Sequence, residues 1–234
     1  NIPLDTGGRY FYLKDGATVW APTWQPVQTP LDHYECRHGL GYTQITGAKN
    51  GLTAEVLYFV PLDENCEIHR LLLRNTTAAE KQIRLFSFIE FCLWNAYDDM
   101  TNFQRNYNTG EVEVEDSVIY HKTEYRERRN HYAFYGVNHP LAGFDTDREE
   151  FLGLYHGLHN PQTVIDGEPK NSLACGWAPI ASHCLDIRLA PGEEKELIFV
   201  LGYIENDPAM KFAETGIINK EPAQKILGKF AKGP

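Results

Sequence analysis

Hydrophobic and polar residues alternate with a period of two along most of the chain, the pattern expected of half-buried strands. Residues 54–60 are rich in β-branched and aromatic side chains and stop at Pro61, and residues 42–46 form a similar run before them. The segment 47–51 between them has the Gly and Asn content of a hairpin turn. The same alternation predicts further strands at 9–13, 67–74, 83–94, 111–115, 118–123, 131–137, 183–189 and 196–204.

Around twelve short strands joined by Gly, Pro, Asn and Asp turns predict a mainly β chain, folded as an antiparallel β-sandwich. Helical patterns do not alternate with the strands, so a doubly wound parallel sheet is not expected. With 234 residues, of which 42% are hydrophobic, the chain is long enough for one large sandwich domain with a substantial core.

Two segments depart from the alternation and predict helices. Residues 147–154 can form a short helix capped by Asp145 or Thr146. From Asn206 onward the alternation stops, and one face of the tail collects apolar residues at helical spacing. These residues are Ile226, Leu227 and Phe230.

A short helix with a single apolar stripe is marginal alone and needs a partner surface. We therefore divide the chain into a β-sandwich domain, residues 1–205, and a helical linker segment, residues 206–234. The first residue is Asn rather than Met. The helical tail that needs a partner surface and the first residue that is not Met lead us to expect a piece of a longer polypeptide.

Charge excludes several classes of partner. The net charge is −10, whereas nucleic acids and anionic membranes are bound by basic surfaces. No apolar run approaches the roughly 18 residues of a spanning helix, and no signal peptide is visible at the start. The five cysteines are widely spread and odd in number, which does not suit a disulfide framework or a zinc site and indicates a reducing, cytoplasmic setting.

The segment 95–106, just after the apolar run that ends at Trp94, has the composition of a sugar-binding loop. Planar amides and a guanidinium offer paired donors and acceptors, and aromatic rings can cover the apolar face of a pyranose. A phosphate or nucleic acid fits poorly because Arg105 is the only cationic residue of segment 95–106. The alternative is a solvated loop whose Asn and Asp side chains satisfy their own backbone. The polar members are Asn95, Asp98, Asp99, Thr101, Asn102, Gln104, Arg105 and Asn106, with Tyr97, Phe103 and Tyr107 among them.

Adjacent carboxylates and paired histidines are candidates for catalytic or metal sites. On an extended segment the adjacent Asp98 and Asp99 point to opposite faces, so turn capping is favoured over a glycosidase pair. The pairs His33/His38 and His156/His159 show no third ligand at a recognised spacing, so no metal is predicted, and a structural hydrogen bond is expected for His38.

Two further clusters keep alternative interpretations. The run 126–129 alternates Arg and Glu, which favours a salt-bridge ladder on a strand over a domain or dimer contact. Trp20 and Trp24, set among prolines, form either an aromatic wall against a sugar or another domain, or plain packing under an irregular loop.

Eight motifs, in order along nearly the whole chain, resemble segments of cellobiose phosphorylases, in the wider family of inverting disaccharide phosphorylases that includes the chitobiose and cellodextrin enzymes. They are Tyr34-Glu-Cys-Arg-His-Gly-Leu-Gly-Tyr-Thr43, Phe59-Val-Pro-Leu62, Phe86-Ser-Phe-Ile-Glu-Phe-Cys-Leu-Trp94, Asp99-Met-Thr-Asn-Phe-Gln-Arg105, Thr123-Glu-Tyr-Arg-Glu-Arg-Arg129, Gly143-Phe-Asp-Thr-Asp147, Gly176-Trp-Ala-Pro-Ile180 and Leu201-Gly-Tyr-Ile-Glu-Asn206.

The resemblance implies a large cytosolic homodimeric enzyme with an N-terminal galactose-mutarotase-like supersandwich, a helical linker and a catalytic (α/α)6 barrel. Such enzymes convert cellobiose and phosphate to α-glucose 1-phosphate and glucose. They need no cofactor, since inorganic phosphate is a co-substrate. We expect the first strands of the sandwich and the whole barrel to be missing from this chain. Because the family places the general-acid Asp and the phosphate site in the barrel, no catalytic residue is expected in this chain, which alone would be inactive.

The family's acceptor pocket, which holds the leaving glucose, is completed by a loop of the sandwich domain. The residues that match it here are Asn95, Asn102, Gln104 and Arg105. Two other functions stay open. A non-catalytic carbohydrate-binding module would bind sugar by itself, which calorimetry would detect. A glycoside hydrolase would release glucose without phosphate, but it requires a converging carboxylate pair that the sequence does not indicate.

Overall fold

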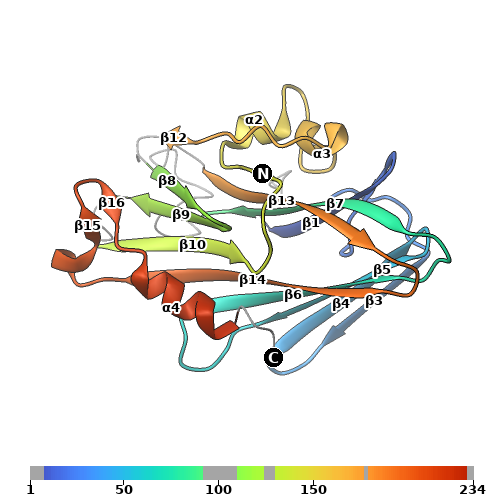
Figure 1. Cartoon of the computed structure of the whole chain (residues 1–234), viewed down its shortest axis with the longest axis horizontal. Helices are drawn as coiled ribbons and strands as arrows, with labels where there is room; N and C mark the ends of the chain where they lie inside the picture. The colour runs from blue at the N-terminus through green and yellow to red at the C-terminus, as the bar shows by residue number, and fades with distance from the viewer. Residues whose placement is uncertain (1–7, 92–109, 124–129, 177–178, 231–234) are drawn as a thin grey trace, which may run out of the picture.

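Two antiparallel sheets pack face to face in the computed structural model, which describes residues 8–91, 110–123, 130–176 and 179–230 (Figure 1). The smaller sheet has the order β11 (Gly143–Asp145), β13 (Ile180–Leu189), β7 (Lys81–Glu90), β1 (Arg9–Asp15) and β2 (Thr18–Trp20). The larger has the order β12 (Cys175–Gly176), β8 (Gly110–Glu115), β9 (Val118–Thr123), β10 (His131–Val137), β14 (Glu194–Glu205), β6 (Cys66–Asn75), β5 (Leu52–Phe59), β4 (Tyr42–Lys49) and β3 (His33–His38). The predicted mainly β, antiparallel sandwich is confirmed.

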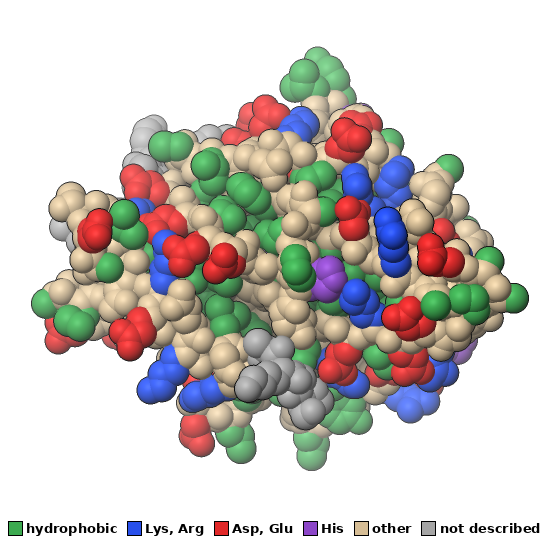
Figure 2. Space-filling view, viewed as in Figure 1, with side chains coloured by type: hydrophobic (Ala, Val, Ile, Leu, Met, Phe, Trp, Pro, Cys, Tyr) green, Lys and Arg blue, Asp and Glu red, His purple; other side chains and the backbone are tan. Residues whose placement is uncertain are grey.

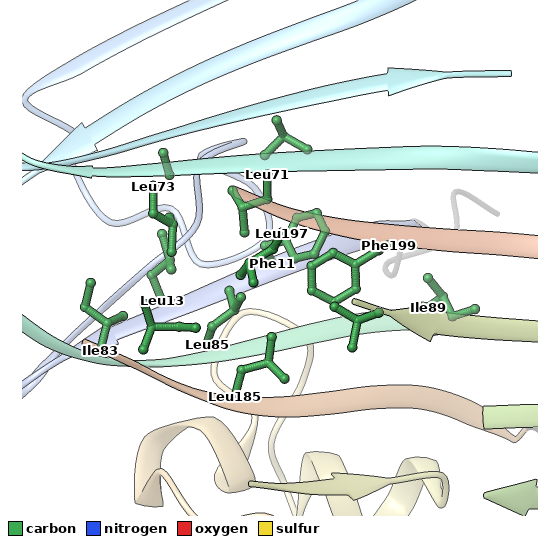
Figure 3. Close-up of a cluster of buried hydrophobic side chains, with 14 of the residues drawn as sticks. Phe11, Leu13, Leu71, Leu73, Ile83, Leu85, Ile89, Leu185, Leu197 and Phe199 are labelled. Carbon is green, nitrogen blue, oxygen red and sulfur yellow. The ribbon is translucent and has the colours of Figure 1, made fainter. Parts of the chain in front are cut away.

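The main core lies between the sheets and follows the period of two. In β7, Ile83, Leu85 and Ile89 face the nine-stranded sheet, while Phe86 and Phe88 belong to a second cluster on the opposite face. Figure 3 shows side chains of both sheets converging in the layer between them. Burial of apolar surface at ~25 cal/mol per Å² makes this layer the main source of stability.

Two short helices, α2 (Arg148–Leu152) and α3 (Gln162–Asp166), cover the outer face of the five-stranded sheet (Figure 1). Phe151 and Val164 pack there against Tyr12 and Phe88. This second buried layer explains why β7 is apolar on both faces.

Helix α4 (Glu221–Phe230) covers the outer face of the nine-stranded sheet (Figure 1). The predicted stripe of Ile226, Leu227 and Phe230 packs against a cluster that includes Phe134 and Ile198. The partner surface that the sequence required is therefore the sheet itself.

The tail before α4 is not wholly helical. It contains a 3-10 turn, η3 (Pro208–Met210), and a two-stranded hairpin of β15 (Phe212–Glu214) and β16 (Ile217–Ile218). The predicted linker segment therefore begins with irregular and extended structure, and its helix starts at Glu221. The division at residue 205 remains a prediction.

The predicted cap of the short helix is wrong. Asp147 is the N-cap of α2, and its carboxylate accepts hydrogen bonds from the backbone N of Glu149 and Glu150. Asp145 instead accepts from the backbone N of Lys170 and Ser172 at 3.2 Å and from Ser172 Oγ at 2.7 Å. The carboxylate of Asp145 is therefore bound by the loop of residues 170–172, and Asp147 caps the helix instead.

The predicted hairpin turn between β4 and β5 is shorter than expected. β4 extends to Lys49, and the turn consists of Asn50 and Gly51, both with positive φ, 51° and 71°. Positive φ at both positions is the conformation that the Asn-Gly pair favours in two-residue hairpins. Gly47 therefore lies in the strand rather than in the turn.

Candidate functional site

The predicted sugar-binding loop connects the two sheets. The described chain leaves the five-stranded sheet at the end of β7 and enters the nine-stranded sheet at the start of β8. The candidate site is therefore defined by the two residues that bracket the loop, Phe91 and Gly110. The predicted acceptor residues themselves, Asn95, Asn102, Gln104 and Arg105, lie outside the described residues, as do Asp98, Asp99 and the run 126–129.

Phe91 is buried at the junction of the sheets. Its side chain is 5% exposed and belongs to the inter-sheet core. Its backbone N donates to Pro179 O at 3.4 Å. Its ring stacks on the imidazole of His121, with centroids 4.9 Å apart and planes inclined by 17°. Because Pro179 precedes β13 and His121 lies in β9, Phe91 contacts strands of both sheets.

Gly110 approaches the same imidazole from the nine-stranded sheet. It pairs with Thr123 of β9 and with Gly176 of β12. A Cβ at position 110 would lie 2.8 Å from His121 Nε2 and 3.2 Å from Gly176 O, so a larger residue would displace the ring or the strand. Here the absence of a side chain allows the close approach of backbone and imidazole.

His121 is 2% exposed and points toward the inter-sheet layer, like Ile119 two residues earlier. Burial lowers its pKa to about 4, and the positive charge of Lys211 contributes, so the ring is neutral at neutral pH. Within the described part of the chain, its Nε2 has no hydrogen-bond partner. The sequence predicts a strand over 118–123 but carries no motif that identifies His121.

The lysines beside this region are tied into ion pairs on the outer face. Lys122 Nζ lies 3.1 Å from both Glu111 Oε2 and Glu113 Oε1, and Lys220 Nζ lies 3.1 Å from Glu113 Oε2. Burial alone would raise the pKa of Glu113, but its hydrogen bonds from Ile218 N and the two lysines lower it. These ion pairs and the hydrogen bond from Ile218 connect the β15–β16 hairpin and the start of α4 to β8 and β9.

Two carboxylates at the adjoining end of the five-stranded sheet are likewise engaged in structural contacts. Glu90, the last residue of β7, accepts from Arg148 Nε at 2.7 Å. Burial raises the pKa of Asp145, and its hydrogen bonds from Ser172 and Lys170 offset part of that effect. Both groups fix segments of the fold, which does not suggest a general acid or base.

The two tryptophans occupy different environments. Trp20, the last residue of β2, is fully buried in the inter-sheet core and not under an irregular loop. Trp24 is 43% exposed, with a positive φ of 63°. The structure therefore does not place both indoles on one exposed wall, and a contact of Trp24 with a sugar or another domain remains a prediction.

His38 and four of the five cysteines lie within the described residues. His38 Nδ1 lies 3.0 Å from Thr43 Oγ1, the structural hydrogen bond that was predicted. Among the described residues no group of three or more His, Cys, Asp or Glu side chains could hold a metal ion. Cys36, Cys66, Cys175 and Cys184 are free, and Cys92 lies outside the described ranges.

Two hollows lie elsewhere on the described part of the sandwich. On the face shown in Figure 2, Lys and Arg side chains are interspersed with Asp and Glu. A hollow of about 440 Å³ on the five-stranded sheet includes Arg84 and Lys14, but Arg84 Nε pairs with Asp186 at 2.8 Å and Lys14 Nζ donates to Ile165 O. A hollow of about 590 Å³ beside α4 has a mainly apolar lining that includes Val118 and Leu227.

In the described ranges no helix is long and apolar enough to cross a membrane.

Comparison with known proteins adds independent findings. The family model described as "Glycosyl hydrolase 94, supersandwich domain" matches residues 1–232. A solabiose phosphorylase of Paenibacillus borealis is 34% identical over 194 residues, which are 80% of this chain and 25% of the relative. An N,N'-diacetylchitobiose phosphorylase of Vibrio furnissii is 32% identical over 211 residues, covering 86% of this chain and 26% of the relative. The chain thus spans about a quarter of the length of these relatives.

A solved structure shares the fold. A bacterial glucoamylase complexed with acarbose superposes with a TM-score of 0.55, covering 94% of this chain and 28% of the glucoamylase at 12% identity. At that identity the likeness concerns the fold alone. It shows that this sandwich architecture occurs within a much longer polypeptide.

Proposed function

The chain belongs to the glycosyl hydrolase 94 supersandwich-domain family, and we propose that it is the N-terminal domain of an inverting disaccharide phosphorylase. The observation that carries the proposal is the family match over residues 1–232. It is joined by two relatives above 30% identity that are both named as disaccharide phosphorylases. The parent enzyme would split a disaccharide with phosphate, releasing a sugar 1-phosphate and a free sugar.

The chemistry needs little catalysis from the sandwich. In an inverting reaction one carboxylic acid protonates the leaving oxygen while a nucleophile attacks the opposite face of the sugar. A hydrolase requires a second carboxylate to activate water, but phosphate is already an anionic nucleophile. The acid and the phosphate site would then lie in a separate catalytic barrel. Glu90 and Asp145, the two carboxylates described beside the loop, make structural contacts with Arg148, Lys170 and Ser172.

The contribution of this domain would be to hold the leaving sugar. Amide and guanidinium groups in segment 95–106 suit a ligand rich in hydroxyls. We assign them to the acceptor subsite on their resemblance to the corresponding loop of cellobiose phosphorylases, and for the same reason we propose cellobiose as the substrate. The parent would act in the cytoplasm as a homodimer without a cofactor, with interdomain and dimer surface supplied by the sandwich. The assigned residues are Asn95, Asn102, Gln104 and Arg105.

The test uses the full-length parent enzyme and follows the sugar 1-phosphate formed from a disaccharide and phosphate, which is α-glucose 1-phosphate when the substrate is cellobiose. Solabiose and N,N'-diacetylchitobiose, the sugars in the relatives' names, serve as matched alternatives. Phosphate-dependent cleavage of cellobiose in preference to both supports the proposed reaction and the proposed substrate. Preference for another disaccharide would keep the reaction and replace the substrate. Glucose release without phosphate would replace the phosphorylase with a hydrolase.

A further inference from the structure

The nine-stranded sheet ends in a long edge strand. β3 is the last strand of this sheet, and no described strand pairs with its outer side (Figure 1). It pairs with β4 over six residues without a register shift. The other edge strands of the two sheets are shorter, with three residues in β2 and β11 and two in β12. A regular, exposed edge of this kind offers a row of backbone donors and acceptors to another strand.

The pairing of β3 with β4 determines which backbone groups face the free edge. Gly39 N donates to Tyr42 O at 2.9 Å, so these two residues form a hydrogen-bonded pair at the end of the hairpin. Hydrogen-bonded and non-hydrogen-bonded pairs alternate along an antiparallel ladder. The odd-numbered residues of β3 therefore bond to β4, and the backbone N–H and C=O groups that point outward are those of Tyr34, Cys36 and His38.

Two charged side chains make this edge complementary to itself. Glu35 and Arg37 flank Cys36 and share one face of β3, where Arg37 Nη2 lies 2.9 Å from Glu35 Oε1 and the side chains are 63% and 44% exposed. A second β3 strand that pairs antiparallel through the outward groups, centred on Cys36, would place Glu35 opposite Arg37 of the second copy, twice by symmetry. Opposite charges directly across a strand pair stabilise the pair.

The same two side chains disfavour the neighbouring registers. Only shifts by an even number of residues keep the outward backbone groups in hydrogen-bonded pairs. A shift of two residues in one direction puts Glu35 opposite Glu35 of the second copy, and in the other direction it puts Arg37 opposite Arg37. Like charges directly opposite each other are destabilising. Charges on an edge strand discourage pairing in general, whereas here they favour one register over its neighbours.

We propose that two copies of the chain associate by antiparallel pairing of their β3 edges about Cys36, which joins the two nine-stranded sheets into one. The three outward pairs would exchange about six backbone hydrogen bonds. The proposal specifies the surface of the homodimer described under the proposed function and rests on that part of it.

The first experiment reverses charges in the full-length enzyme and measures the dimer dissociation constant by sedimentation over a dilution series. Glu35→Arg places like charges opposite each other at two symmetric positions and should raise the constant by about ten-fold or more, as should Arg37→Glu. The double variant Glu35→Arg/Arg37→Glu restores opposite charges and should return the constant close to the wild-type value. Arg74→Glu, in an exposed ion pair with Glu194 on β6, is the control and should leave the constant unchanged.

The second experiment locates the contact by cross-linking. In the proposed register Cys36 forms a hydrogen-bonded pair with its own counterpart, so the two Cα atoms would lie about 5.5 Å apart. A short bismaleimide should therefore link two wild-type copies, giving a product of twice the mass on a denaturing gel, and Cys36→Ser should abolish that product. Cys175 is also exposed, so Cys175→Ser is the matched control and should keep the product.

The outcomes separate the interface from the proposed function. A dimer that is equally stable in all the variants and is not linked through Cys36 refutes the β3 interface and keeps the homodimer, leaving this edge to another strand of the parent chain. An enzyme that is monomeric at every concentration refutes both the interface and the homodimer. Phosphate-dependent cleavage of a disaccharide by that monomer would still keep the proposed reaction.

Discussion

His183 Nδ1 lies 3.0 Å from Ser87 Oγ in the fully buried layer between the two sheets. The same hydroxyl accepts a hydrogen bond from the backbone N of His183 at 3.0 Å. Burial lowers the pKa of His183 to about 3, so the folded domain holds this ring in its neutral form.

The folded state should therefore lose stability in mild acid. The unfolded state binds a proton at His183 below its usual pKa of 6.5, while the folded state does not until about 3. Stability is fully present above 6.5 and is lost as pH falls toward the folded value. At pH 5 the difference between the folded and unfolded pKa of His183 lowers the free energy of unfolding by about 2 kcal/mol.

Urea unfolding at pH 7 and pH 5 measures this effect. The double variant Ser87→Ala/His183→Phe removes the titrating ring together with its partner. We expect its loss of unfolding free energy between the two pH values to be smaller than that of the wild type by about 2 kcal/mol. An identical loss in both proteins would show that His183 does not titrate in this way.

Gly47 of β4 lies against the backbone of Pro22. A Cβ at position 47 would come within 2.7 Å of Pro22 O and 2.9 Å of Pro22 Cα, and backbone atoms cannot rotate away. Gly47→Ala should therefore lower the unfolding free energy by about 1–3 kcal/mol. The control is Gly41→Ala, just before the same strand, where a Cβ would meet nothing within 4 Å. Equal urea midpoints for the two variants would contradict the steric argument.

Glu113 joins the hairpin and the start of α4 to the large sheet. It pairs with Lys122 and Lys220 and accepts from Ile218 N at 3.1 Å, and its side chain is 17% exposed. Since these contacts lower its pKa, its contribution is present above the usual value of 4.5 and disappears as pH falls through the folded value. Glu113→Gln should destabilise the fold by about 1 kcal/mol at pH 7 and much less at pH 3.

The neighbouring acid provides the comparison. Glu115 pairs with Lys220 at 2.7 Å, but its side chain is 46% exposed. Solvent screening limits such a pair, so Glu115→Gln should change the unfolding free energy by less than about 0.5 kcal/mol. If both substitutions have the same small effect, the buried position of Glu113 gives it no additional role.

Strands with one apolar face could be predicted from the sequence. The predicted ranges 118–123 and 131–137 have the bounds of β9 and β10. β3 was not predicted, because five of its six residues are exposed and no buried face marks it. The N-cap of α2 was misassigned because Asp145, Thr146 and Asp147 are all capable caps. The contact of Asp145 with residues 170–172 depends on the tertiary fold.

The candidate site could be predicted only in part. The composition of a segment can be read without the tertiary fold. The amides, aromatic rings and Arg105 of segment 95–106 therefore suffice to predict sugar-binding chemistry there. The meeting of Phe91, Gly110 and His121 depends on how two sheets pack, and no sequence spacing encodes it. A buried histidine is also indistinguishable from an exposed one until the strand's inward face is known.

Arg105 is the sharpest test of the acceptor assignment. A guanidinium fork can donate two hydrogen bonds to sugar hydroxyls in fixed geometry. Its loss should leave polar groups unpaired at about 1–3 kcal/mol, which reduces kcat/KM for glucose as acceptor by about 5- to 150-fold. Arg105→Lys keeps the charge but not the fork and should remain clearly impaired. Initial rates in the synthetic direction measure this, with Arg188→Ala on an exposed position of β13 as the control. Acceptor kinetics that stay normal in Arg105→Ala would remove the residue from the subsite, whereas an equal loss for α-glucose 1-phosphate would indicate a general disturbance of the enzyme.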